Sequence, residues 1–284
     1  MSLSILTNIS AMNTQQNLLN SSNAVSQSMA RLSSGLRINS AADDAAGYAI
    51  SQGLTSQVNG LNQASSNTND AISMVQTASS SLNDVQNMLQ RVYELGVQYN
   101  NGSNSSTDKS DIQSEVNQLT QEIDRQQSSS NFNGLNLLNG SAGSTGTVTF
   151  QVGANGGDTL TATFSNVEGS SGLGGLGFSW GNAATGGTVI DLSSASALTS
   201  LTSAINNISS MAATLGAVQN RLQYTSDSIS STEQNLSASN SQIKDVNMAQ
   251  EMTNMTQEQI LEQAGTSMLA QANSQPQLIL KLLG

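Results

Sequence analysis

The sequence predicts a mainly α-helical protein: a long antiparallel, coiled-coil-like helical bundle with a small β-hairpin-rich insert and helical terminal arms. Two long stretches place an aliphatic residue at most seventh positions, which is the spacing of a packed helix seam. A segment between them holds most of the 24 glycines. Only 3% of the 284 residues are aromatic, so the core must be built mainly from aliphatic helix faces.

The first long helix is predicted from about residue 43 to residue 100. Its two seam tracks, with a seven-residue spacing in each, are Leu54, Leu61, Thr68, Val75, Leu82 and Leu89, and Gln57, Ala64, Ala71, Ala78, Val85 and Val92. Ser40 and Asp43 have the spacing of a capping box, which predicts the start of this helix. A helix of this length extends roughly 85 Å at 1.5 Å per residue.

A shorter helix and a second long helix follow the first. Ile112, Val116, Leu119 and Ile123 step by four and three after a turn-rich stretch, so the short helix is expected to fold back along the first. The second long seam has an unbroken seven-residue spacing: Leu201, Ile208, Leu215, Leu222, Ile229, Leu236 and Ile243. Neither long helix can bury its seam alone, so the two are expected to pack on each other.

The glycine-rich segment, residues 131–191, predicts β-structure. Two stretches alternate apolar with polar residues, one through Val148, Phe150 and Val152 and the other through Leu160, Ala162 and Phe164. Asn155-Gly156 between them is a hairpin signal. A third strand is expected through Leu176, Phe178 and Trp180.

The predicted organisation therefore has three parts. Residues 1–42 and 247–284 form the terminal helical arms, residues 43–130 and 192–246 form the helical bundle, and residues 131–191 form the insert. Pro276 is expected to end the last helix before Leu278. The arms carry apolar residues at helical spacing with few aromatic side chains to build a core of their own; these residues are Leu18, Val25, Met29, Leu32, Leu36, Met248, Met252, Met255, Leu261 and Met268.

The composition excludes several classes of function. With no His and no Cys, the chain has no His or Cys nucleophile or base, no ordinary zinc site and no disulfide. We therefore expect no catalytic residues, no metal and no cofactor. The net charge of −11 argues against nucleic acid as a partner, and no apolar run approaches the ~20 residues needed to enter a membrane as a spanning helix.

Two short motifs have simpler explanations than a ligand site. Residues 172–177 fit the pattern G-x-G-x-x-G, but the expected neighbours are a flexible loop and a strand, whereas a nucleotide site needs a strand before the motif and a helix after it. Asp43 and Asp44 are two adjacent carboxylates that a cation would suit. At a helix N-terminus, however, capping and the helix dipole account for them more simply.

Several segments resemble the bacterial flagellin family. They are residues 32–47 (LSSGLRINSAADDAAG), 89–92 (LQRV), 131–134 (NFNG), 215–221 (LGAVQNR) and 259–273 (QILEQAGTSMLAQAN). They cover both ends of the chain in the family's order. The resemblance implies a structural, non-enzymatic subunit that is exported, lies outside the cell and polymerises into the flagellar filament. It also implies that the terminal arms form the inner core of the filament and that the large outer domains of many flagellins are missing.

The physical pattern points the same way. Apolar arms at both ends of a chain are covered most simply by other copies of that chain, and head-to-tail contacts that do not close give an open helical polymer. The resemblance adds the flagellar export chaperone, the filament cap and hook-associated proteins as partners. The alternatives are a hook–filament junction protein, a signalling coiled coil, or an enzyme or sugar-binding module carried by the insert.

The resemblance also carries over one contact with an innate Toll-like receptor. The candidate contact residues are Arg91, Glu94, Leu95 and Glu115. The sequence departs from the family pattern at Tyr93, where Arg is usual, and at Gly96, where Ala is usual. An alternative interpretation is that Arg91 and Glu115 form an ion pair between helices or between subunits.

Overall fold

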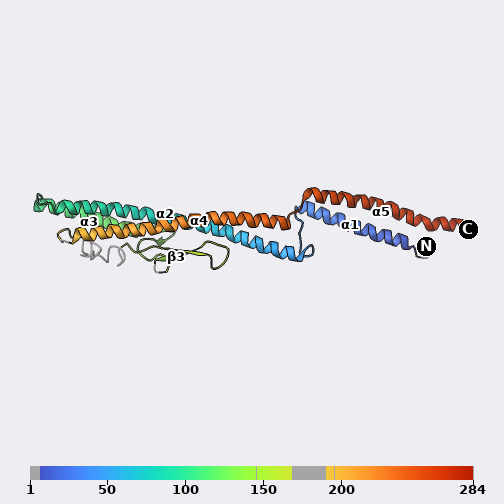
Figure 1. The fold of residues 1–284 in the computed structure, drawn as a ribbon, viewed down its shortest axis with the longest axis horizontal. Coiled ribbons are helices and arrows are strands. Elements are labelled where there is room, and N and C mark those ends of the chain that lie inside the picture. Colours follow the sequence, from blue (N-terminus) through green and yellow to red (C-terminus); the bar gives the residue numbers. More distant parts are fainter. Residues whose placement is uncertain (1–6, 145, 168–189, 195, 284) are drawn as a thin grey trace. The chain divides into compact units, whose positions relative to one another are not determined.

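The computed structural model describes residues 7–144, 146–167, 190–194 and 196–283 of the chain (Figure 1). Its elements, in order, are α1 (Ile9–Ser34), α2 (Ala45–Tyr99), α3 (Ser106–Ser129), β1 (Asn131–Phe132), β2 (Leu135–Asn136), β3 (Thr147–Gln151), β4 (Thr159–Thr163), α4 (Ala197–Lys244) and α5 (Met248–Leu283). The predicted fold class is confirmed. None of the helices in the described residues combines the length and the hydropathy needed to cross a bilayer.

The chain forms two compact units, one of Met1–Gln57 with Asn235–Gly284 and the other of Val58–Gln234. The division falls inside α2 and α4. The predicted limits of the terminal arms, residues 42 and 247, lie just before the starts of α2 and α5.

The unit of Val58–Gln234 has a core built from the predicted seams. On α2, the seam positions from Leu61 to Val92 are all buried, whereas Gln57 is exposed and outside the seam. Thr68 is fully buried at its seam position, and its hydroxyl avoids the cost of an unpaired donor by donating to the Ala64 carbonyl oxygen at 2.7 Å. On α4, the buried seam residues are Leu201, Ala204, Ile208, Leu215, Val218, Leu222 and Ile229. Residues of α3 and of the hairpin region complete the same apolar cluster.

Burial along α4 declines after its second track becomes polar at Thr225, and Ile229 is the last buried seam residue. Thr232 and Ser239 are exposed, and Leu236 and Ile243 are only half-buried. A heptad seam needs apolar residues in both tracks to exclude water. The apolar seam of α4 therefore weakens toward the end of the helix.

A capping box begins α3. The Ser105 hydroxyl accepts from the Asp108 N–H at 3.2 Å, and the Asp108 carboxylate accepts from the Ser105 N–H at 2.8 Å. The hydrogen bond from the Ser105 backbone, with a second from the Ser105 hydroxyl, lowers the pKa of Asp108 from its ordinary value of 3.8. This box fixes the start of the helix that packs Ile112, Val116 and Ile123 into the core.

The substitution Ser105→Ala is expected to lower the free energy of unfolding of this unit by about 1 kcal/mol, because the first turn of α3 loses a side-chain acceptor.

The contribution of the Asp108 carboxylate to the stability of this unit depends on pH. Because folding lowers this pKa below 3.8, the stabilisation is complete above that value and is lost as the pH falls below it. In thermal unfolding, Asp108→Asn should melt below the unaltered chain at neutral pH and converge with it in acid. The same gap at both pH values would contradict this assignment.

Two hairpins follow α3. β3 and β4 pair antiparallel with Phe150 opposite Leu160, as the alternation predicts. The expected third strand through Leu176, Phe178 and Trp180 lies outside the described residues. β1 and β2 form a short hairpin that was not predicted from the sequence. Its signal was Asn133-Gly134, whose positive φ angles of 49° and 80° are those of the tight turn that this dipeptide favours.

The predicted capping box at Ser40 and Asp43 is wrong. α2 begins at Ala45, and its cap is Asp44, whose carboxylate accepts from the Gly47 N–H at 2.9 Å. The Ser40 hydroxyl donates to Asp43 rather than accepting from the helix, and Asp43 accepts from the Asn39 and Ser40 N–H groups. The hydrogen bond from the Ser40 backbone is the main cause that lowers the pKa of Asp43.

The predicted break at Pro276 is also wrong, because α5 continues to Leu283. A proline inside a helix removes the N–H that would bond to the carbonyl four residues earlier, which here belongs to Ala272. In the structure the Asn8 side chain donates to the Ala272 carbonyl oxygen at 2.9 Å. The carbonyl that the proline leaves without a helical donor is therefore not an unpaired polar group.

Candidate assembly surface on the terminal helices

The helices α1 and α5 lie side by side and antiparallel (Figure 1). Each turns one face to the other, with residues spaced by three and four. We call these two faces the inward seam. On α1 it consists of Ala11, Thr14, Leu18, Ser21, Val25, Ser28 and Leu32, and on α5 of Glu251, Met255, Glu258, Glu262, Gly265, Leu269 and Ala272; all are buried or half-buried.

The inward seam is poor in large apolar side chains. Small and polar residues fill most of it, and Gly265 allows a close approach, since a Cβ there would lie 3.3 Å from Leu18 Cδ1. Glu258 and Glu262 are four residues apart on one helix face, a like-charge pair that costs a helix about 0.2–0.5 kcal/mol. Apolar burial contributes about 25 cal/mol per Å², and this seam buries few large apolar side chains. The contact between the two helices therefore contributes little free energy of stabilisation.

Large apolar side chains are instead exposed on both helices outside the inward seam, on surfaces that we call the outer flanks. They are Ile9, Met12, Leu19 and Met29 on α1, and Met248, Met252, Ile260, Leu261 and Met268 on α5, each between 47% and 63% exposed. At 3.6 residues per turn, Met248 and Met252 project on one flank of the α5 seam, and Leu261 and Met268 project on the other. A shallow groove of about 410 Å³ runs beside Ile260 and Leu261.

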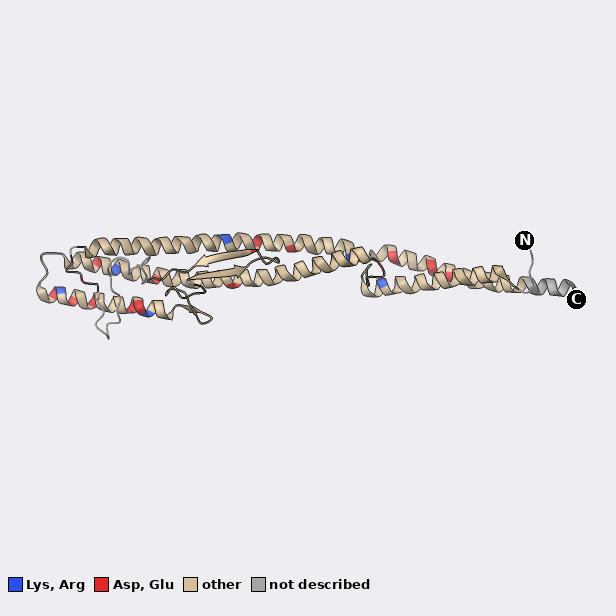
Figure 2. Ribbon diagram, turned by 90° about the horizontal axis from the view of Figure 1, so that it is seen from below, with Lys and Arg blue, Asp and Glu red and all other residues tan. Residues whose placement is uncertain are grey.

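Charged side chains are sparse on these helices (Figure 2). The described part of α1 has Arg31 as its one charged residue, whereas α5 carries Glu251, Glu258 and Glu262 between residues 248 and 275. Few ionic groups therefore have to lose water when this surface is covered by a partner.

The structure separates the ten predicted arm residues into two groups. Five are exposed on the outer flanks: Met29, Met248, Met252, Leu261 and Met268. Five face the chain itself: Leu18, Val25, Leu32 and Met255 lie on the inward seam, and Leu36 pairs with Asp245 in an isolated bridge. Four further exposed residues were not predicted, although bulky apolar residues at helical spacing were the available signal: Ile9, Met12, Leu19 and Ile260.

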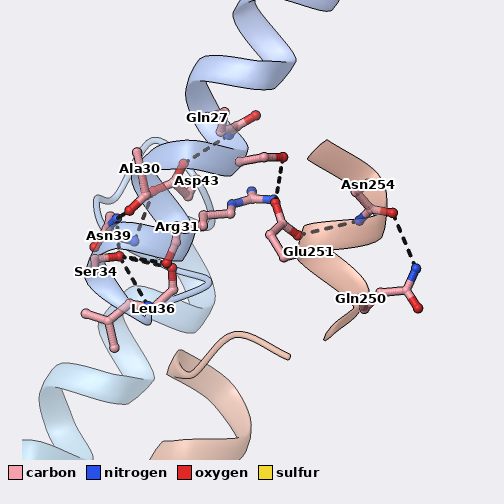
Figure 3. A network of polar contacts seen from close by, with 11 residues as sticks. Gln27, Ala30, Arg31, Ser34, Leu36, Asn39, Asp43, Gln250, Glu251 and Asn254 are labelled. Atoms are coloured by element: carbon pink, nitrogen blue, oxygen red, sulfur yellow. Dashed lines mark hydrogen bonds and ion pairs between the residues drawn. The ribbon is translucent and has the colours of Figure 1, made fainter. Parts of the chain in front are cut away.

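A polar network holds the two helices together near the end of α1 (Figure 3). Glu251 is only 7% exposed; it accepts from the Ser28 hydroxyl at 2.8 Å, and its carboxylate lies 3.7 Å from Arg31 Nη1. Burying a carboxylate is costly unless it is hydrogen-bonded and paired. This network therefore favours one alignment of α5 along α1.

The loop that follows α1 is tied to the connection before α5. Gly35 ends α1 with a left-handed φ of 72°, which glycine adopts without steric cost. Its carbonyl accepts from the Val246 N–H at 3.0 Å, and the Arg37 N–H donates to the Lys244 carbonyl at 2.7 Å. The Arg37 guanidinium donates to the Ile243 carbonyl at 2.7 Å. These bonds bring residues 35–37 beside the chain that enters α5. Residues 35–37 belong to segment 32–47, which resembles flagellin.

The candidate receptor residues lie on α2 and α3. Arg91 donates through Nη2 to Glu115 at 2.9 Å and through Nη1 to Glu94 at 3.3 Å, so the inter-helix ion pair is present within one chain. These hydrogen bonds, chiefly the one to Glu115, raise the pKa of Arg91. The three side chains are about half exposed or more, so solvent screens the pairs and they add little to stability. Leu95 is 1% exposed and belongs to the core.

Among the described residues, no group of three or more acidic side chains could hold a metal ion. Asp43 and Asp44 act through backbone N–H groups, as described above. The G-x-G-x-x-G stretch at residues 172–177 lies outside the described residues.

These features define a class of protein: an α-helical subunit whose paired terminal helices gain little from each other and carry uncovered apolar flanks. Comparison with known families identifies the particular one. The model of the bacterial flagellin N-terminal helical region matches residues 5–143, and that of the C-terminal helical region matches residues 198–283.

Individual proteins similar to this chain are also flagellins or flagellar filament proteins. A flagellin of Halalkalibacterium halodurans is 40% identical over 97% of this chain and 98% of its own length, and the flagellar filament 33 kDa core protein of Treponema phagedenis is 44% identical with the same coverage. The chain belongs to the bacterial flagellin family, whose members are structural subunits of the flagellar filament. A putative flagellar hook-associated protein of Vibrio parahaemolyticus shares the fold at 16% identity and a TM-score of 0.51, covering 72% of this chain and all of that one.

Proposed function

We propose that the outer flanks of α1 and α5 are the surfaces through which copies of this chain join into a filament. The observation that carries the proposal is the distribution of side chains on α5: Glu258 and Glu262 face α1, whereas Met252, Ile260 and Met268 are exposed. A lone subunit thus keeps its weaker face covered and its apolar face in water. Contact with other copies would remove the exposed apolar side chains from water, and apolar burial contributes about 25 cal/mol per Å².

Two flanks on one helix favour an open polymer over a closed dimer. Met248 and Met252 on one side and Leu261 and Met268 on the other give each subunit two different surfaces for neighbours. Contacts between unlike surfaces repeat without closing when the rotation does not return to the start, and the product is a helical filament.

The remaining partners follow from the family. We propose that the chain is exported, acts outside the cell as a passive, non-enzymatic building block, and meets an export chaperone, the filament cap and hook-associated proteins on the way. The net charge of −11 supports the absence of nucleic acid among its partners.

The Toll-like receptor is a further proposed partner, with a narrower contact than the sequence pattern suggests. Arg91, Glu94 and Glu115 are exposed and can be reached. Leu95 is buried in the core and is not accessible to a receptor in this subunit. The ion pair between Arg91 and Glu115 is exposed and adds little to stability, so it gives little support to the alternative that these residues have a purely structural role.

Electron microscopy of the purified full chain after salt-induced assembly tests the proposal. The expected result is filaments of micrometre length formed by this chain alone. A hook–filament junction protein would instead remain monomeric or form only short assemblies, and that outcome would overturn the proposed role.

A further inference from the structure

Pro276 removes one backbone hydrogen bond inside α5. The helix runs from Met248 to Leu283, and a proline has no N–H to donate to the carbonyl four residues earlier. The carbonyl that loses its helical donor is that of Ala272. This residue lies on the inward seam and is half-buried, and a buried carbonyl without a partner costs about as much as a lost hydrogen bond.

Asn8 meets this carbonyl from the other helix. Its Nδ2 donates to the Ala272 oxygen at 2.9 Å, and its Oδ1 accepts from the Ala11 N–H at 3.1 Å as the N-cap of α1. The two contacts fix the orientation of the amide, because the reverse orientation would set donor against donor and acceptor against acceptor. One side chain thus serves a free N–H at the start of α1 and a free C=O in α5.

We propose that Asn8 is a clasp between the terminal helices, and that it allows α5 to continue through Pro276. Asparagine suits the role because its short side chain carries a donor and an acceptor together. Aspartate would keep the cap and lose the donor, and alanine would lose both. Pro276 in turn makes the carbonyl of Ala272 a specific target, since a carbonyl in a regular stretch of helix already has its N–H donor four residues later.

The clasp acts together with the network at the opposite end of the pair. Ser28 and Glu251 meet near the start of α5, and Asn8 and Ala272 meet where α1 begins. Both contacts belong to one antiparallel alignment of the helices. Because the inward seam between them is small and polar, these two contacts select the register that apolar packing alone leaves weakly defined.

The test is a double-mutant cycle in the full chain assembled into filaments. Asn8→Asp removes the donor and keeps the cap, and Pro276→Ala restores the helical N–H for Ala272. Amide hydrogen exchange, read by mass spectrometry over residues 269–283, reports on this end of α5. Asn13→Asp is the matched control, because Asn13 is an exposed asparagine on the same helix.

In the unaltered background, Asn8→Asp is expected to speed exchange in this segment roughly five-fold, the equivalent of one hydrogen bond of about 1 kcal/mol. With Pro276→Ala present, the same change should alter exchange by about two-fold or less. Asn13→Asp should have no effect on the segment.

Two results would overturn the clasp: an Asn8→Asp variant that exchanges like the unaltered chain, or one that speeds exchange equally in both backgrounds. If Asn8→Asp alone prevents filament formation, the rescue decides. Filaments restored by adding Pro276→Ala support the clasp, and continued failure contradicts it.

Discussion

Filaments are expected to disappear when either terminal helix is removed. Deleting roughly residues 1–36 or residues 248–284 removes one half of the α1–α5 pair and, with it, apolar side chains such as Ile9 and Met12 or Ile260 and Met268. The surviving partner helix then has neither its inward contact nor its outer neighbours. Electron microscopy after salt-induced assembly should show no filaments for either deletion, a complete loss against the full chain.

The helical bundle is expected to survive these deletions. The apolar cluster that includes Val75, Leu89, Ile123, Phe164 and Leu201 lies entirely between residues 71 and 222. Circular dichroism should therefore show a cooperative thermal transition in the truncated chains. Filaments formed by a chain that lacks both arms would refute the role given to the terminal helices.

A single charge on either outer flank is expected to weaken assembly strongly. Met252→Glu and Met268→Glu each place a carboxylate where an apolar side chain, 49% and 60% exposed in the subunit, is proposed to meet a neighbouring copy. The variant loses about 1.5–3 kcal/mol of apolar burial and must also desolvate a charge. Since each 1.4 kcal/mol is a factor of ten, the critical concentration for polymerisation should rise at least about tenfold.

The control for this experiment is Gln271→Glu, which adds the same charge at an exposed polar position of α5. It should change the critical concentration far less than either flank variant, as measured by sedimentation. Both flanks need to respond for the two-neighbour arrangement to hold. If only the Met252 variant were impaired and Met268→Glu assembled normally, the contact would involve one flank.

Much of the fold follows from local spacing. The heptads of α2 and α4 predict which residues are buried between Leu61 and Ile229, because a long helix exposes the same face every seventh residue whatever lies opposite. The β3–β4 hairpin follows from alternation around Asn155-Gly156 in the same way. The tight β1–β2 turn could have been predicted from Asn133-Gly134, but its strands are only two residues long.

Other features depend on contacts between distant residues. Local sequence rules predict that Pro276 breaks a helix. The helix nevertheless continues, and the carbonyl of Ala272 that lacks a helical donor accepts a hydrogen bond from Asn8, which lies 264 residues before Ala272. Asp43 and Asp44 differ only in which backbone N–H groups lie within reach, so spacing alone assigned the cap to the wrong one.

The candidate assembly surface shows the same limit. Met252 and Met255 are chemically identical, yet the first is exposed and the second faces α1. The sequence shows that α5 carries apolar residues on several sides, but which side is covered depends on the face against which α1 packs. Leu95 is a similar case, since its place in the core depends on how α2 packs against α4.

The central claim is that α1 and α5 become stable only when other copies cover their outer flanks. Amide hydrogen exchange of the full chain, in dilute solution and in filaments, tests it most directly. The expected result is fast exchange across Ile9–Ser34 and Met248–Leu283 in the monomer and strong protection of both helices in the filament. Equal, strong protection of both helices in a monomer that stays monomeric when concentrated would contradict the claim.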